Sequence, residues 1–138
     1  MIEDTYKIVH RIPEVTEFQL LRQVLGYEMV DDGTVEKALR NSLFAVCAER
    51  DSLMIGCVRV VGDGGLYFFI EDLMLLPGLE NEGEEKSITD YMMDEVMEYL
   101  KTNAPPNAFF CIKDSKEARD HCRQLGFRMP AGEIEPSL

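Results

Sequence analysis

The chain has 138 residues, a formal net charge of −12 and 46% hydrophobic residues. These values predict a single globular domain spanning residues 1–138 and argue against nucleic acid or an anionic membrane as a partner, because both bind cationic patches. A cationic small-molecule amine or a basic protein segment fits the charge better, although acidity also serves solubility alone. No apolar run approaches the roughly 20 residues of a membrane-spanning helix, and no secretory signal is present, so we expect a cytoplasmic protein.

Apolar periodicity predicts strands and helices that follow one another along the chain. The predicted strands are 6–10, 43–48, 54–61, 66–76, 108–112 and a last one from 127, and the predicted helices are 15–25, 34–40, 87–101 and 115–124. Gly26 is expected to end the first helix, and Thr34 to cap the second. Hairpin-linked strands followed by crossover units imply a mixed sheet with helices on its faces.

Four cysteines occur without a C-x-x-C pair. Cys47, Cys57 and Cys111 lie inside apolar runs, where a free thiol behaves as a small hydrophobic side chain. We therefore predict that these cysteines are reduced core residues rather than members of disulfides. The two histidines, His10 and His121, are too few and too scattered for a zinc site, so no metal site is predicted.

Residues 70–100 combine an apolar strand, a Pro-Gly break, a polar loop and an amphipathic helix. A loop between a strand and a helix N-terminus commonly binds anions, because free N–H groups and the helix dipole both point at it. Here the loop carries Glu80, Glu82, Glu84 and Glu85. The backbone pattern thus indicates a phosphate site, whereas the side chains carry the same charge as phosphate.

Several segments together resemble one known family over nearly the whole chain. They are L-R-Q-V-L-G at 21–26, N-S-L-F at 41–44, I-G-C-V-R-V-V-G-D-G at 55–64, D-L-M-L-L-P at 72–77 and L-G-F at 125–127. In this order they resemble the GNAT superfamily of acyl-CoA-dependent N-acetyltransferases. The resemblance implies an α/β fold of the α+β type, with a central, mostly antiparallel mixed sheet and helices on both faces.

The resemblance also implies a site for acetyl-CoA. In the family, the strand equivalent to 72–76 carries a bulge and splays from its neighbour. The segment Leu73, Met74 and Leu75 would then contact the cofactor, with the backbone groups of Leu73 and Leu75 pairing with its pantetheine arm.

After the strand, the family has a loop of the form Gln/Arg-x-x-Gly-x-Gly/Ala, whose N–H groups hold the pyrophosphate. This chain has Glu80 at the first position, keeps Gly83 and has Glu85 at the second small position, and Lys86 offsets one of these charges. A glutamate at the second small position obstructs the diphosphate and adds like charge. Alternatively, the glutamates point into solvent and favour the helix N-terminus. The sequence thus predicts a degenerate pyrophosphate loop.

Three residues are candidates for proton transfer. Many family members place a tyrosine near the C-terminus as the general acid, and this chain has Cys122 there, which could instead be a buried inert thiol. Glu71 and Asp72 lie where the family often has the general base, and Asp72 could be structural. Neighbouring residues of a strand face opposite sides, so without a bulge only one of these two can face the cleft.

Two functions remain open at this point. The first is an N-acetyltransferase with impaired acetyl-CoA binding, whose acidic surface suits a polyamine, an aminoglycoside or a lysine side chain. The second is a non-catalytic binding or regulatory module of the same fold, acting as a homodimer or on another protein. The combined departures at Glu80, Glu85 and Cys122 motivate the second.

Overall fold

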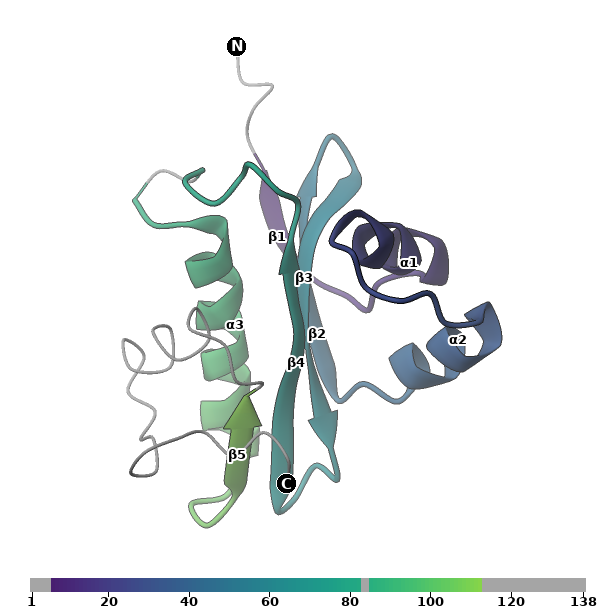
Figure 1. Ribbon diagram of the computed structural model, residues 1–138. Coiled ribbons are helices and arrows are strands. Elements are labelled where there is room, and N and C mark those ends of the chain that lie inside the picture. Colours follow the sequence, from purple (N-terminus) through teal and green to yellow (C-terminus); the bar gives the residue numbers. More distant parts are fainter. Residues whose placement is uncertain (1–5, 83–84, 113–138) are drawn as a thin grey trace, which may run out of the picture.

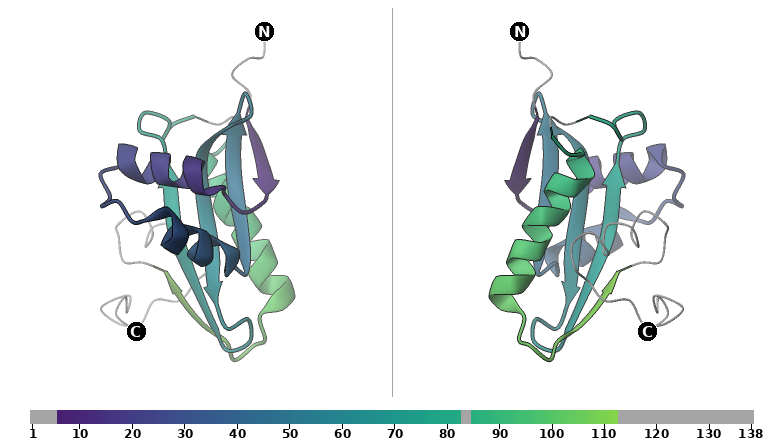
Figure 2. Two further views of the ribbon diagram at one scale, coloured as in Figure 1. Left: turned by 90° about the vertical axis from the view of Figure 1, so that its right-hand side faces the viewer. Right: turned by 90° about the vertical axis from the view of Figure 1, so that its left-hand side faces the viewer.

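The computed structural model describes residues 6–82 and 85–112. Within these ranges, a five-stranded sheet in the order β1-β2-β3-β4-β5 separates α1 and α2 on one face from α3 on the other (Figures 1 and 2). The elements are β1 (Lys7–His10), α1 (Val15–Val24), α2 (Asp32–Arg40), β2 (Phe44–Arg50), β3 (Leu53–Gly62), β4 (Tyr67–Leu75), α3 (Ile88–Asn103) and β5 (Phe109–Ile112).

The sheet is mostly antiparallel, as predicted. Neighbours from β1 to β4 run antiparallel and are linked in part by hairpins, whereas β5 runs parallel to β4 after the crossover through α3. This arrangement confirms the predicted fold class. The predicted helix at 115–124 and the strand from 127 lie outside the described residues.

Two apolar layers hold the helices to the sheet. The layer under α3 contains Met92 and Met93, both fully buried, so the methionine-rich face of this helix is a packed one. The layer under α1 and α2 joins Phe18 and Leu39 to residues of β2, β3 and β4. Sheet residues alternate between the two layers because successive side chains of a strand point to opposite faces.

The first residues of α2 correct one prediction. The helix begins at Asp32, and its cap is Asp31 rather than Thr34. One carboxylate oxygen of Asp31 accepts the Thr34 N–H at 3.0 Å, and the other accepts the Thr34 hydroxyl at 2.8 Å. Thr34 therefore lies inside the first turn, where its N–H needs an acceptor and Asp31 supplies it.

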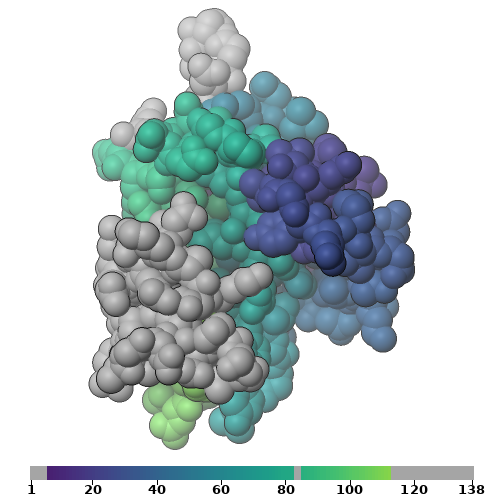
Figure 3. All heavy atoms as spheres, in the orientation of Figure 1, coloured from purple at the N-terminus to yellow at the C-terminus, as the bar shows by residue number. Residues whose placement is uncertain are grey.

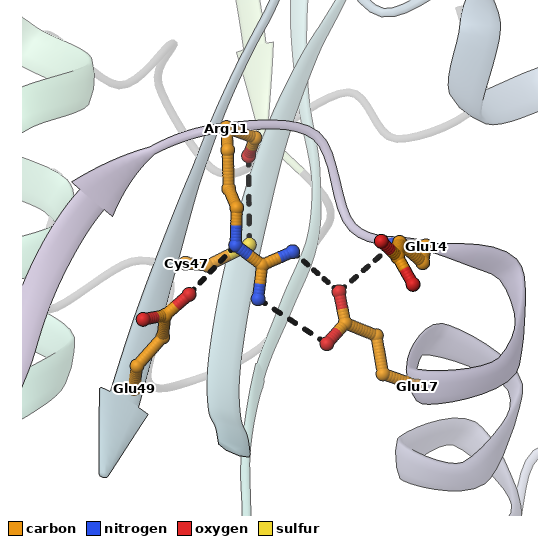
Figure 4. A network of polar contacts seen from close by, with 5 residues as sticks. All are labelled: Arg11, Glu14, Glu17, Cys47 and Glu49. Carbon is orange, nitrogen blue, oxygen red and sulfur yellow. Dashed lines mark hydrogen bonds and ion pairs between the residues drawn. The ribbon is translucent and has the colours of Figure 1, made fainter. Parts of the chain in front are cut away.

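Arg11 fastens the start of α1 to the sheet (Figure 4). Its guanidinium donates to both carboxylate oxygens of Glu17 on α1 and, at 2.7 Å through Nε, to Glu49 on β2. Glu17 also accepts the Glu14 N–H at 2.8 Å, which closes a capping box. One side chain thus joins the end of β1, the first turn of α1 and a strand next to β1.

The predicted core cysteines are confirmed at two positions. Cys47 and Cys57 are free thiols with no exposed surface. Burial raises the pKa of the Cys47 thiol to about 12 and that of Cys57 well above its ordinary value, so both stay protonated at neutral pH. Cys111 is also present as a thiol, but it is only half-buried. None of the helices in the described part of the chain is long and apolar enough to cross a membrane.

Candidate active site

A β-bulge interrupts β4 at the position that the resemblance predicted. In the register of β3 and β4, Cys57 is opposite Met74 and Arg59 is opposite Glu71. One residue of β3 therefore faces two of β4, which is the signature of a bulge. Asp72 adopts a left-handed backbone conformation there, with φ of 58°, and aspartate is among the residues that tolerate this region best.

The bulge brings both candidate bases to the same side of the sheet. Glu71 is opposite Arg59, so their side chains share the face covered by α1 and α2. The Asp72 carboxylate accepts the Arg59 Nε–H at 2.7 Å and so turns to that face as well. The restriction expected for a regular strand does not hold here. Asp72 is engaged in an ion pair, while Glu71 is half-buried beside it.

Beyond the bulge, one edge of β4 is not paired with any strand in the described part of the chain. The pairing with β5 ends at Ile70 and Ile112, and no described strand continues it along residues 71–75. The Leu76 N–H donates to Ile55 of β3 at 2.8 Å. Because backbone groups alternate in direction along a strand, those of Leu75 and Leu73 point to the other edge. These are the groups expected to pair with a pantetheine arm, so this part of the site fits acetyl-CoA.

In the loop after β4, a backbone N–H binds a carboxylate of the same loop. The Gly78 N–H donates to Glu80, with nitrogen–oxygen distances of 3.1 and 3.4 Å to the two carboxylate oxygens. Glu82 lies 3.4 Å from the guanidinium of Arg50, at the end of β2. This loop is exposed at the top of the molecule in Figure 3. A phosphate entering it would meet a backbone donor and a cation that already contact acidic side chains.

Polar groups at the start of α3 also have partners within the protein. Ser87 caps the helix by accepting the Asp90 N–H at 3.0 Å. Lys86 forms an ion pair with Asp94, and its ammonium lies 5.2 Å from the centre of the Tyr91 ring. The cation predicted to offset the glutamates therefore already has an acidic partner.

The remaining predicted residues have different outcomes. Glu85 is exposed before the cap of α3. Gly83 and Cys122 lie outside the described residues, so their roles stay predictions. Met74 is buried against the α1 and α2 layer, and by the same alternation its backbone groups point toward β3, as those of Leu76 do.

Sequence reasoning missed Arg50 and Arg59 as parts of this region. Arg59 sits between Val58 and Val60, which are both fully buried, and its own side chain is 11% exposed. A cation inside an apolar strand run was the available signal, because a buried charge requires a partner. Arg50 had no such signal, since it ends a strand next to a turn.

Comparisons with known proteins support the same fold. No protein-family model and no curated protein matches the chain. A solved structure from meticillin-resistant Staphylococcus aureus, described as a protein of unknown function and probable acetyltransferase, has a TM-score of 0.79 and 26% identity, covering 93% of this chain and 92% of that one. A GNAT family acetyltransferase from Streptococcus pneumoniae TIGR4 has a TM-score of 0.70 and 22% identity, with 91% and 89% covered.

A more distant structure holds the cofactor. It is described as a predicted acetyltransferase with acetyl-CoA from Clostridium acetobutylicum, with a TM-score of 0.60 and 19% identity, covering 94% of this chain and 95% of that one. The predicted resemblance is thus confirmed, and the chain has the fold of the GNAT acetyltransferases.

Proposed function

We propose that this protein is an N-acetyltransferase that transfers an acetyl group from acetyl-CoA to a primary amine, with its affinity for acetyl-CoA lowered by its own loop carboxylates. The β4 bulge is the observation that carries the proposal. It combines a strand edge suited to pantetheine with a carboxylate, Glu71, on the face covered by α1 and α2. Likeness of fold alone would not establish the activity.

Each part of the bulge has a role in this proposal. Acetyl-CoA would supply the acetyl group as a thioester, and the outward backbone groups of Leu73 and Leu75 would hold its pantetheine arm. Glu71 accepts a proton from the amine, directly or through water. A strand N–H near Leu73 stabilises the developing oxyanion, and when the C–S bond breaks CoA would leave as a thiolate that takes up a proton from solvent. Arg59 binds the Asp72 carboxylate, which fits a structural role for Asp72.

The acidic loop is the reason to expect weak cofactor binding. Two like charges about 4 Å apart repel by roughly 4 kcal/mol at an effective dielectric constant of about 20, before screening. Several glutamates near a diphosphate therefore cost a few kcal/mol, or about a hundredfold in affinity. Glu80 adds to this effect because its carboxylate already binds the Gly78 N–H.

The acceptor in this proposal is a cationic amine, either a small molecule or a lysine side chain in a basic segment. The net charge of −12 attracts such a group and repels polyanions. We propose the cytoplasm as its compartment, where the buried thiols Cys47 and Cys57 would remain reduced.

A second candidate is a non-catalytic module that has kept the fold. The contact between Glu80 and the Gly78 N–H favours it, since a loop that binds its own carboxylate has less need of an external anion. Such a module would act by binding a basic partner or a second copy of itself.

Thermal melting with acetyl-CoA, combined with an acetylation assay on primary amines, separates the two candidates. A ligand at 100 times its dissociation constant adds about 2.7 kcal/mol, which is a shift of several degrees for a domain of this size. We expect such a shift only at millimolar acetyl-CoA, together with acetylation. As a control, Glu71→Gln should keep the shift and lose turnover. If millimolar acetyl-CoA produces no shift and no acetylation is detected, the non-catalytic module is the better account.

A further inference from the structure

Arg59 contacts more segments around the bulge than a simple ion pair would require. Its Nε donates to Asp72 at 2.7 Å. One terminal nitrogen donates to the Ala38 carbonyl near the end of α2 at 2.9 Å and to the Ser42 hydroxyl at 3.0 Å. Its guanidinium carbon also lies 5.9 Å from the centre of the Phe18 ring on α1. The side chain thus links both helices of one face to the bulge of β4.

The bulge itself depends on contacts of this kind. A left-handed conformation at a residue other than glycine costs energy and persists when neighbouring contacts hold it. Asp72 is held at two points, since Arg59 binds its carboxylate and the Cys57 thiol donates to its carbonyl oxygen with a sulfur–oxygen distance of 3.5 Å. Both donors come from β3, where they lie on either side of Val58, the residue opposite the bulge.

We propose that Arg59 is a positioning residue that fixes the β4 bulge, and through it the direction of Glu71 and of the backbone groups of Leu73 and Leu75. The inference rests on the proposed function for its catalytic consequence, but its structural part stands independently. The forked guanidinium is essential here, because Nε holds Asp72 while a terminal nitrogen holds the end of α2. Arg59 does not itself need to contact the acetyl donor or the amine.

Amide hydrogen exchange, followed in peptides that cover residues 72–76, tests the structural part without any activity. In Arg59→Met we expect exchange of the Met74 and Leu76 amides, which point to β3, to rise about tenfold more than exchange of β2 amides at residues 45–48, because charge-assisted hydrogen bonds to the bulge are lost. Arg59→Lys should not restore protection, since lysine keeps the charge and lacks the fork. Asp72→Asn keeps the residue shape and should give a smaller rise.

Arg40→Met is the matched control, because Arg40 also pairs with a carboxylate but is 60% exposed on α2. It should leave exchange at residues 72–76 unchanged. An equal rise in β2 and at the bulge for Arg59→Met would show general destabilisation and overturn the proposal. Full protection in Arg59→Lys would overturn it too, because charge alone would then suffice.

Kinetics test the catalytic consequence separately. If the wild type acetylates an amine, Arg59→Met should lower kcat about tenfold, while its KM for that amine stays within about threefold of the wild-type KM. The reason is that the variant misplaces the base and does not remove a contact with the amine. An unchanged kcat would overturn the catalytic part. A wild type without activity would instead remove the proposed function, and the exchange result would still decide the role of Arg59.

Discussion

Arg11 illustrates how single residues hold distant segments together in this fold. Its guanidinium bridges Glu17 and Glu49, and hydrogen bonding to Glu17 raises the Arg11 pKa further above its ordinary value. Burial opposes the charge on Glu17, but the hydrogen bonds from Arg11 and from the Glu14 N–H outweigh it and lower the pKa of Glu17 below its ordinary value. Each partner therefore stabilises the charged form of the other.

This pairing predicts a pH-dependent effect of Glu17→Gln. Because the folded state lowers the pKa of Glu17, the ion pair stabilises the fold fully above the unfolded value near 4.5 and is lost as the pH falls through the folded value. At pH 7 the variant should lose about 1–2 kcal/mol of unfolding free energy, as expected for a partly buried charged hydrogen bond. Urea unfolding at pH 7 and at pH 3 measures the change.

The difference from wild type should shrink at the lower pH. Glu36→Gln serves as the control, because Glu36 pairs with Arg40 in an exposed helical position and should cost at most about 0.5 kcal/mol. A loss for Glu17→Gln that is as large at pH 3 as at pH 7 would mean that packing, and not charge, explains the contact.

At the scale of elements, the turn between β3 and β4 contains two glycines with positive φ, Gly62 and Gly64, and Gly62 is the more tightly enclosed. Gly62 has φ of 144°, and a Cβ placed on it would lie 2.1 Å from the Tyr67 carbonyl oxygen. Asp63 completes the turn, since one of its carboxylate oxygens accepts the N–H groups of Gly65, Leu66 and Tyr67 at 2.9 Å each. The turn sets the register of the strand that carries the bulge.

Gly62→Ala should therefore destabilise the protein by more than about 2 kcal/mol, because the backbone must move before the methyl group fits. Gly65→Ala is the matched control in the same turn. Its Cβ would have only the Asp63 carboxylate within reach, at 3.9 Å, and we expect a change within about 0.5 kcal/mol. Thermal or urea unfolding of both variants decides the point, and equal effects would contradict this account of the turn.

The elements themselves follow largely from local pattern, whereas the site depends on contacts that pattern does not encode. Periodicity predicted the helices and strands as far as β5, and turn chemistry predicted the end of α1 at Gly26. The error at Thr34 reflects two good capping residues close together in the sequence: Asp31 starts the helix earlier, and its carboxylate accepts both the N–H and the hydroxyl of Thr34.

The bulge came from the family resemblance and not from periodicity, because an apolar run of this length is compatible with a regular strand. The partners of its residues depend on register across β3 and β4. No local signal relates Arg59 to Ala38 or Asp72, which are 21 and 13 positions away along the chain. The contact of Glu80 with the Gly78 N–H likewise depends on a side-chain rotamer that the sequence does not specify.

At the scale of the whole molecule, the net charge of −12 predicts an unusual salt dependence. Proteins that bind phosphates through cations lose affinity as salt rises, because salt screens the attraction. Here the loop acids repel the anionic cofactor, so affinity for acetyl-CoA should rise about two- to threefold between 10 and about 150 mM salt, as the Debye length shortens to about 8 Å. Titration calorimetry at several salt concentrations measures this change. An affinity that falls with salt would mean that cations dominate the site.

Titration calorimetry of acetyl-CoA with loop variants tests the central claim most directly. Glu80→Gln/Glu85→Gly removes both proposed obstacles, and Glu36→Gln/Glu98→Gln removes the same charge from exposed positions on α2 and α3. We predict that the loop variant binds acetyl-CoA about a hundredfold more tightly than wild type, since relief of a few kcal/mol gives that factor, and that the control changes little. Equal affinities for the wild type and the loop variant would contradict the account.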